Sequence, residues 1–140
     1  MGLDMYLEGE KYLWCGDDGE KLSEQLPEFN GFRIKKVRAE VAYWRKANQI
    51  HSWFVQNVQN GTDDCGDYEV SREQLTTLLN LCKKVLKTKN HKLLEPSEGF
   101  FFGGTDIDEW YWTNLKETVT QLKAVLKLPK EIVIYYHSSW

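Results

Sequence analysis

The stretch Val41–Asn60, VAYWRKANQIHSWFVQNVQN, places the strongest constraint on how this chain can fold. At about 100° per residue its side chains divide into two faces, which predicts an amphipathic helix ending at Asn60-Gly61. The apolar face would pack on a core and consists of Tyr43, Ala47, Ile50, Phe54 and Val58. The opposite face consists of Arg45, Asn48, Gln49, Ser52, Gln56 and Gln59.

The polar face of this predicted helix is made of amides, whereas solvated helix faces usually carry Glu and Lys in pairs. A carboxamide offers both donors and an acceptor, so the face is suited to recognition. In the alternative, the helix lies beneath another element and its amides bind loop backbone. That alternative is favoured for Asn48 and Ser52, and ligand contact is favoured for Arg45 and Gln49.

The other periodic segments predict one α+β domain spanning residues 1–140. Alternating segments at Met1–Trp14 and Phe32–Ala42 would pair as an antiparallel ribbon, and Glu131–His137 is β-rich. A second helix should begin after Ser71, where Gln74 completes a capping box, and run to about Lys87. A third should run from Asp106 to Lys127. We therefore expect a small antiparallel sheet, the N-terminal ribbon plus the C-terminal strand, packed with three helices in the order β-β-α-α-α-β.

Composition narrows the class of protein. The 140-residue chain has a net charge of −3, which argues against general nucleic-acid binding and leaves only local basic patches. Three cysteines without C-x-x-C spacing are typical of a reduced, cytosolic protein. The start of the chain lacks the apolar run of a signal peptide, and no segment predicts a membrane span. We expect a protein without membrane association, located in the cytoplasm.

A second candidate site is Ser97–Thr105, SEGFFFGGT. The three residues Phe100, Phe101 and Phe102 cannot all face one side, and glycines such as Gly103 let backbone approach a ligand closely. The segment also precedes a helix N-terminus, which suits an anion, although the acids that follow already complement the helix dipole. The alternative is a corner packed by aromatic side chains.

Metal binding and catalysis have weaker signals. The Asp63-Asp64-Cys65 segment, with His51 nearby, holds ligand types but no zinc spacing, and a Cys65 nucleophile is supported by residue types alone. We expect no metal, no cofactor and no catalytic residue. His51 is expected to be a buried histidine bonded to a carbonyl, and Trp140 to dock on its own domain or a neighbouring subunit.

Five segments together resemble a family of small proteins encoded by phages and prophages. These segments are MGLDMYL at Met1–Leu7, YWRKANQIHSWFV at Tyr43–Val55, DDCGDYEVSREQL at Asp63–Leu75, FFFG at Phe100–Gly103 with DEWY at Asp108–Tyr111, and the terminal SSW at Ser138–Trp140. The resemblance implies a phage origin, and members of the family carry no catalytic assignment. Accessory phage proteins of this size often counter host defence, and one class sequesters nucleotide immune signals in aromatic, Arg and amide pockets near subunit interfaces.

The leading hypothesis is a non-enzymatic, homo-oligomeric binding protein that captures a small anionic, nucleotide-like ligand in the bacterial cytoplasm. Arg45 and Lys46 would meet phosphate, Asn48 and Gln49 would contact polar edges, and aromatic rings would stack on a base. The predicted ligand-binding residues are Trp44, Arg45, Lys46, Asn48, Gln49, Phe100, Phe101, Phe102, Gly103 and Trp110. One alternative is a protein-binding inhibitor of a host defence protein, whose acidic loops mimic nucleic acid. Another is a small enzyme acting on phosphoesters.

Overall fold

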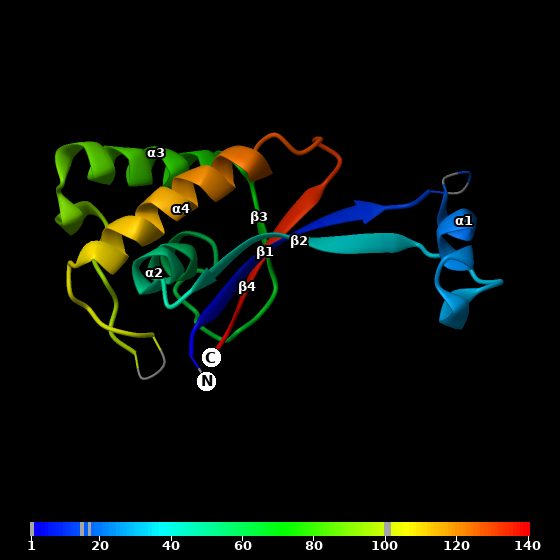
Figure 1. The fold of residues 1–140 in the computed structure, drawn as a ribbon, viewed down its shortest axis with the longest axis horizontal. Helices are drawn as coiled ribbons and strands as arrows, with labels where there is room; N and C mark the ends of the chain where they lie inside the picture. Colours follow the sequence, from blue (N-terminus) through cyan, green and yellow to red (C-terminus); the bar gives the residue numbers. More distant parts are fainter. Residues whose placement is uncertain (1, 15, 17, 100–101) are drawn as a thin grey trace.

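A computed structural model describes residues 2–14, 16, 18–99 and 102–140 (Figure 1). Its elements are β1 (Asp4–Tyr12), α1 (Gly19–Glu24), a 3-10 turn (Pro27–Phe29), β2 (Lys36–Arg45), α2 (Asn48–Asn57), β3 (Tyr68–Val70), α3 (Arg72–Thr88), a second 3-10 turn (His91–Leu93), α4 (Glu109–Val125) and β4 (Val133–Ser139). The four strands form one antiparallel sheet in the order β2-β1-β4-β3. The predicted α+β class with an antiparallel sheet and three main helices is confirmed.

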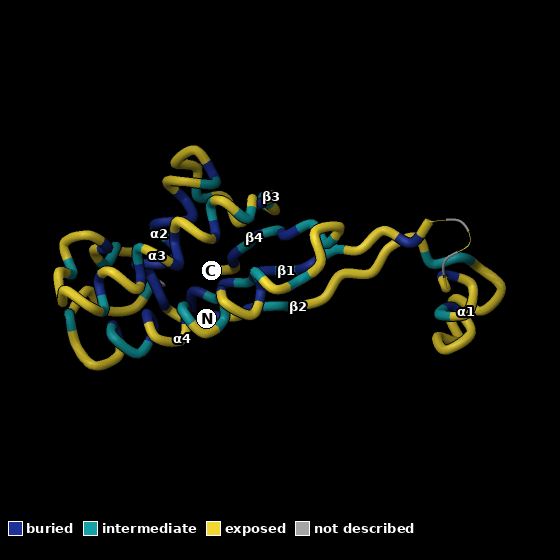
Figure 2. Tube along the Cα trace, turned by 90° about the horizontal axis from the view of Figure 1, so that it is seen from above, coloured by how far each residue is buried: buried dark blue, intermediate teal, exposed yellow. Residues whose placement is uncertain are grey.

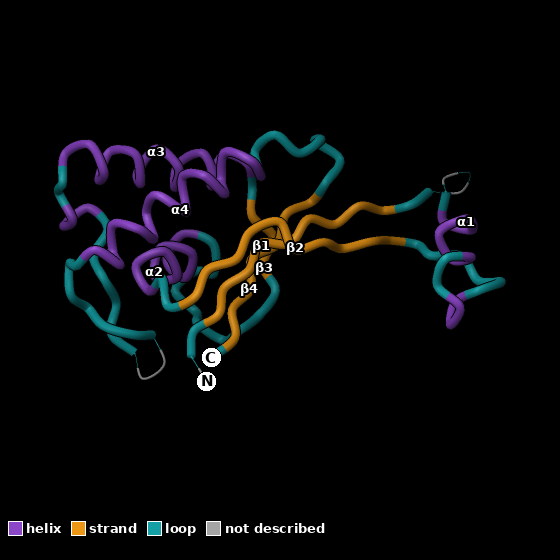
Figure 3. The backbone as a smooth tube through the Cα atoms, viewed as in Figure 1, coloured by secondary structure: helices purple, strands orange, loops and turns teal. Residues whose placement is uncertain are grey.

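The helices α2, α3 and α4 gather at one side of the sheet, and the core lies between the two layers (Figures 1 and 3). Alternation along β1 explains this, because Met5 and Leu7 are fully buried while Tyr6 and Glu8 are only half-buried. In the centre of the core the ring of Tyr136 on β4 stacks on Phe54 of α2, with centroids 3.9 Å apart.

The predicted helix Val41–Asn60 is wrong at its N-terminal end, because Val41–Arg45 belongs to β2. Ala42 and Trp44 point into the core while Tyr43 and Arg45 are exposed, which is a period of two and not of 3.6. β-branched and aromatic side chains favour this extended backbone. Lys46 then adopts a left-handed conformation, φ +54°, which separates the strand from the helix. Asn48, Gln49 and Gln59 are buried, so the amides do not form a solvent-facing stripe.

One short strand was not predicted, and one helix start was predicted correctly. This strand, β3, begins at Tyr68, shortly before α3. The short helix α1 lies between β1 and β2, the two strands of the ribbon. At the start of α3 the Ser71 side chain accepts from the Gln74 backbone N–H, and the Gln74 side chain accepts from the Ser71 N–H. The predicted capping box is therefore confirmed.

Beyond Glu10 the ribbon leaves the body of the protein as an arm, residues 11–37 (Figure 2). In this part β1 pairs only with β2, since its pairing with β4 ends at the Glu10–Val133 position. The arm carries α1 at its far end and is mostly exposed (Figures 1 and 2).

The face of the sheet opposite the helices carries a network of charged and aromatic side chains. Arg38 donates to Glu8, Glu10 and Asp67 at 2.9–3.1 Å, and its guanidinium lies over the Tyr135 ring. His137 pairs with Glu8 at 2.9 Å. The hydrogen bond from His137, and then that from Arg38, lower the pKa of Glu8 below its ordinary value. The acids on this face are thus largely compensated by its own cations.

We expect Glu8→Gln to reduce the acid sensitivity of folding. A carboxyl whose pKa is lowered in the folded state contributes stability above its unfolded pKa of 4.5, and this contribution is lost as pH falls through the lowered value. Wild type should therefore exceed Glu8→Gln in unfolding free energy at pH 7, and the difference should shrink below pH 4.5. Urea unfolding at both ends of this range measures it. Glu40→Gln, an exposed acid on β2, is the control; a difference independent of pH would contradict the assignment.

A candidate ligand cavity between α2 and α4

The segment before α4 folds back over the start of α2, and Asn48 holds it there. The Asn48 amide donates to the carbonyls of Phe102 at 3.0 Å and Gly104 at 2.9 Å, and its oxygen accepts from the Ser97 N–H at 3.0 Å. These three bonds engage both amide hydrogens and the oxygen. Asn48 is therefore an amide that binds loop backbone, as the alternative interpretation has it, and it positions Ser97, Phe102 and Gly104.

A cavity of about 200 Å³ lies where this loop meets the N-terminal turn of α4. Gln49 lines it; this side chain is 98% buried, and its amide nitrogen has no hydrogen-bond partner among the described residues. Asn114 of α4 also lines the cavity and is only 3% exposed. Its side chain forms no hydrogen bond with another described residue. A buried amide without a partner costs about 1–3 kcal/mol, so the site favours a molecule that supplies one.

A second, open groove of about 580 Å³ adjoins the cavity, and Trp110 and Asn114 line both. Trp110 stands on the first turn of α4 with 55% of its surface exposed. The groove follows the edge of β2, where Gln121 of α4 donates to the Tyr43 carbonyl and accepts from the Tyr43 N–H. The cavity alone is smaller than the 300–1,000 Å³ or so of typical small-molecule sites, and the groove brings the site into that range.

Charges of both signs surround the two hollows. Lys46, Asp106 and Asp108 line the cavity, and Arg45, Lys116 and Glu117 line the groove. Asp108 also accepts from the Tyr111 N–H and so caps α4. Among the described residues no carboxylate lies within 4.0 Å of the Arg45 guanidinium, which is exposed. The groove thus offers two cations and one carboxylate, and the cavity offers two carboxylates, one cation and several amides.

Of the predicted ligand-binding residues, five line the cavity, two others line the groove, and Phe102 lines neither. Lys46, Asn48, Gln49, Gly103 and Trp110 line the cavity, and Arg45 and Trp44 line the groove. Trp44 is a core residue whose indole N–H donates to Thr118. Phe102 lines neither hollow, because its ring packs against His51 and lies near Trp140. Phe100 and Phe101 lie outside the described residues.

Gly103 gives the cavity wall a left-handed backbone conformation. Its φ of +87° favours glycine, and a Cβ there would come within 3.4 Å of the Lys46 Cβ. The left-handed Lys46 and Gly103 therefore pack against each other and set the wall between the end of β2 and the loop.

His51 lies in a separate buried network and takes no part in either hollow. Its Nε2 meets Asp63 at 2.9 Å and its Nδ1 meets the Tyr136 hydroxyl at 2.6 Å. A carboxylate oxygen only accepts, so Nε2 donates to Asp63, and in that tautomer Nδ1 accepts from the Tyr136 hydroxyl. Burial raises the pKa of Tyr136 well above its ordinary value. The predicted carbonyl partner is wrong, and both ring nitrogens are engaged, which leaves none to activate Cys65. The Trp140 indole donates to Asp63 at 3.2 Å, so this residue docks on its own domain.

In residues 2–14, 16, 18–99 and 102–140, no three His, Cys, Asp or Glu side chains gather so that they could hold a metal ion. None of the helices in these same ranges has the length and apolar character needed to cross a bilayer.

Comparison with known proteins adds no family: no family model matches the chain, and no curated protein or solved structure is significantly similar to it.

Proposed function

We propose that this chain is a non-enzymatic binding protein for a small nucleotide-type ligand. The base would enter the cavity beside Gln49 and Asn114, its ring would stack on Trp110, and its phosphate would lie in the groove at Arg45 and Lys116. The observation that carries the proposal is the unpartnered Gln49 amide in the wall of a cavity beside an exposed tryptophan.

The distribution of polar groups supports a nucleotide over a simple anion. The cavity holds Asp106 and Asp108, which repel an anion but accept hydrogen bonds from the amino and imino groups of a base. The groove holds Arg45, whose planar fork suits phosphate. A molecule with a neutral, donor-bearing ring at one end and an anionic group at the other fits both hollows. The resemblance to small phage proteins supports a setting in which capture of such a molecule removes a host defence signal.

The acidic-mimic alternative receives less support from the structure. A mimic of nucleic acid needs an extended surface of uncompensated carboxylates, whereas on the sheet face Glu8, Glu10 and Asp67 converge on Arg38.

Titration of the purified chain with the 5′-monophosphates of adenosine, guanosine, cytidine and uridine, followed by calorimetry, tests the proposal. We expect at least one to bind, and Trp110→Ala to weaken that binding about tenfold to hundredfold, because stacking contributes about 1–3 kcal/mol per base. Arg45→Ala should abolish detectable capture and leave the melting temperature almost unchanged, since the residue is exposed.

Lys123→Ala removes an exposed cation on α4 that lines neither hollow and serves as the matched control. Native mass spectrometry of the protein as purified shows whether a nucleotide already occupies the site. Absence of binding to all four nucleotides, with no copurified nucleotide, would refute the proposed function. A large fall in stability in Arg45→Ala would make that residue structural.

A further inference from the structure

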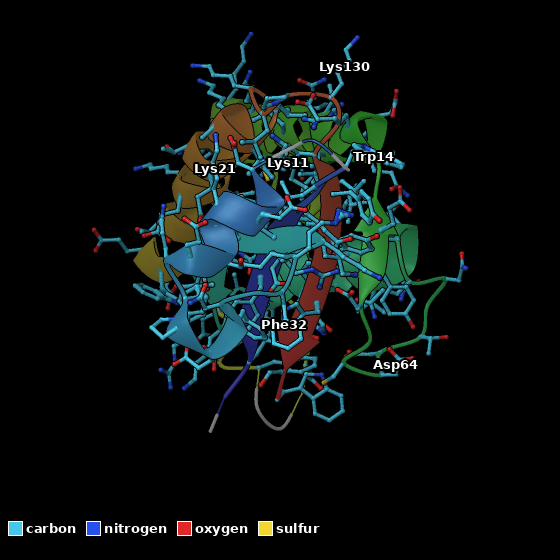
Figure 4. The ribbon with its side chains drawn as sticks, turned by 90° about the vertical axis from the view of Figure 1, so that its right-hand side faces the viewer. Lys11, Trp14, Lys21, Phe32, Asp64 and Lys130 are labelled. Carbon is cyan, nitrogen blue, oxygen red and sulfur yellow. The ribbon has the colours of Figure 1, made fainter. Side chains whose placement is uncertain are left out.

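The arm, and in particular its tip at residues 18–37, carries most of the exposed large hydrophobic side chains among the described residues. Of the ten large hydrophobic side chains that are exposed in the described part of the chain, six lie on the arm. They are Tyr12, Trp14, Leu26, Phe29, Phe32 and Val37. Phe32 is 70% exposed, and Figure 4 shows the tip end-on with Phe32 and Lys21 labelled. A concentration of exposed aromatic and aliphatic side chains on a protruding element marks an interface.

The tip is an ordered platform held by backbone contacts. Leu13 donates to the Lys35 carbonyl at 2.7 Å, and Arg33 donates to the Leu13 carbonyl at 3.0 Å. Gly19 lets α1 approach residues 33–34 so closely that a Cβ would come within 2.5 Å of the Ile34 carbonyl oxygen. A surface fixed in this way loses little conformational freedom on association.

A groove of about 430 Å³ runs along the tip, and its lining combines apolar side chains with cations. Leu22, Leu26, Phe29, Phe32, Ile34 and Val37 form its apolar part. Arg33, Lys35 and Lys36 are the charged lining residues, and the groove has no acid among its described lining residues.

The acids of the tip lie on α1 and the turn that follows it, and two of them, Glu20 and Glu24, share a second hollow with Arg33. Glu20, Glu24 and Glu28 are exposed, and no described cation lies within 4.0 Å of any of them. The ion pair of α1 joins Asp18 to Lys21 at 3.3 Å. The tip therefore presents an apolar centre, a basic rim (Arg33, Lys35 and Lys36) and an acidic side (Glu20, Glu24 and Glu28). On the rim, Lys36 pairs with Glu10 at 3.6 Å, whereas no carboxylate of the described residues lies within 4.0 Å of Lys35.

We propose that the tip is the interface of a symmetric dimer, in which a second copy of this chain occupies the groove. A two-fold interface brings the same patch of both copies together, so it must be complementary to itself. The tip meets this requirement, because the basic rim of one copy can face the acidic side of the other while Phe29 and Phe32 are buried between them. The arms join tip to tip, and the two ligand cavities lie at opposite ends of the dimer.

Sedimentation equilibrium of the full chain, from about 1 µM to about 1 mM, tests the proposal. We expect a monomer–dimer equilibrium for the wild type. The double variant Phe29→Ser, Phe32→Ser should raise the dimer Kd about a hundredfold, because aromatic anchors supply most of the energy of such interfaces. Leu93→Ser, which removes an exposed hydrophobic side chain of the body, should dimerise like the wild type. Circular dichroism checks that both variants are folded. If Leu93→Ser also lost the dimer, the interface would not be specific to the tip.

Variants with reversed charges at the tip distinguish a second copy of this chain from any other molecule in the groove. Lys35→Glu alone places like charges opposite each other, and so does the pair Glu24→Lys, Glu28→Lys; each should weaken self-association about tenfold or more. Mixed together, the two variants should form a heterodimer, since every contact between the tips regains opposite charges. A wild type that stays monomeric at about 1 mM would overturn the proposal and leave an acidic amphipathic segment of another protein as the occupant. A mixture that does not associate would overturn the symmetric arrangement.

Discussion

Tyr136→Ala is expected to lower the free energy of unfolding by about 4 kcal/mol, the largest loss among the single substitutions considered. Tyr136 is fully buried, its ring stacks on Phe54 at 3.9 Å, and its hydroxyl donates to His51. The substitution removes the stacked ring from between the sheet and α2 and leaves the His51 Nδ1 without a donor. Urea unfolding followed by circular dichroism measures the loss.

Tyr136→Phe separates the ring from the hydroxyl. It keeps the stack on Phe54 and removes only the donor to His51, so we expect a loss of about 2 kcal/mol, the cost of one buried unpaired nitrogen. Tyr135→Phe, the neighbouring position on the other face of the sheet, should change stability by less than about 0.5 kcal/mol. Equal losses in both phenylalanine variants would show that the His51 network contributes nothing specific.

Asn48→Ala should have the second-largest effect, a loss of about 3 kcal/mol together with loss of the ligand site. Three hydrogen bonds of this side chain hold the backbone of Ser97, Phe102 and Gly104 at the start of α2, and each contributes about 1 kcal/mol. Without them the loop carbonyls of Phe102 and Gly104 lose their donor, and the wall that Gly103 gives to the cavity is released. Unfolding free energy and nucleotide titration should therefore fall together.

Gln56→Ala is the matched control, because Gln56 is an exposed amide on the same helix. It should unfold within about 0.5 kcal/mol of the wild type. Asn48→Asp provides a second variant with nearly the same shape: it keeps an acceptor for the Ser97 N–H but cannot donate to the two carbonyls. If Asn48→Asp were as stable as the wild type, the two donated bonds would not hold the loop.

The sequence predicts those elements whose periodicity is unambiguous. Alternation in β1 and the Ser71–Gln74 capping box of α3 are local signals, and the structure confirms both. The segment Val41–Arg45 carries no such signal, because five residues fit a strand and the first turn of a helix equally well. Only pairing with β1, which places Trp44 opposite Met5, decides between them. That pairing is a long-range contact that local pattern cannot reveal.

The candidate site was predicted in part for a similar reason. Gln49 and Trp110 were named from two separate segments, and the fold brings both to one cavity. The sequence analysis does not name Asn114, although the sequence holds a signal for it. Asn114 shares the apolar face of α4 with Tyr111, Leu115 and Leu122. A polar side chain on such a face requires a hydrogen-bond partner when it is buried. The sequence places Phe102 at the ligand because three consecutive Phe cannot all face one side and the glycines let backbone approach a ligand, whereas its ring packs on His51.

The most direct test of the ligand cavity is to follow the side-chain amide signals of Gln49 and Asn114 by ¹H–¹⁵N NMR during titration with the four nucleoside monophosphates. Gln49→Leu and Asn114→Leu assign the two signals. The account predicts that both signals and the Trp110 indole signal shift together and saturate at one nucleotide per chain, while the signal of Gln56 stays fixed. Saturating binding that leaves the Gln49 and Asn114 signals unmoved, or shifts confined to exposed amides, would contradict it.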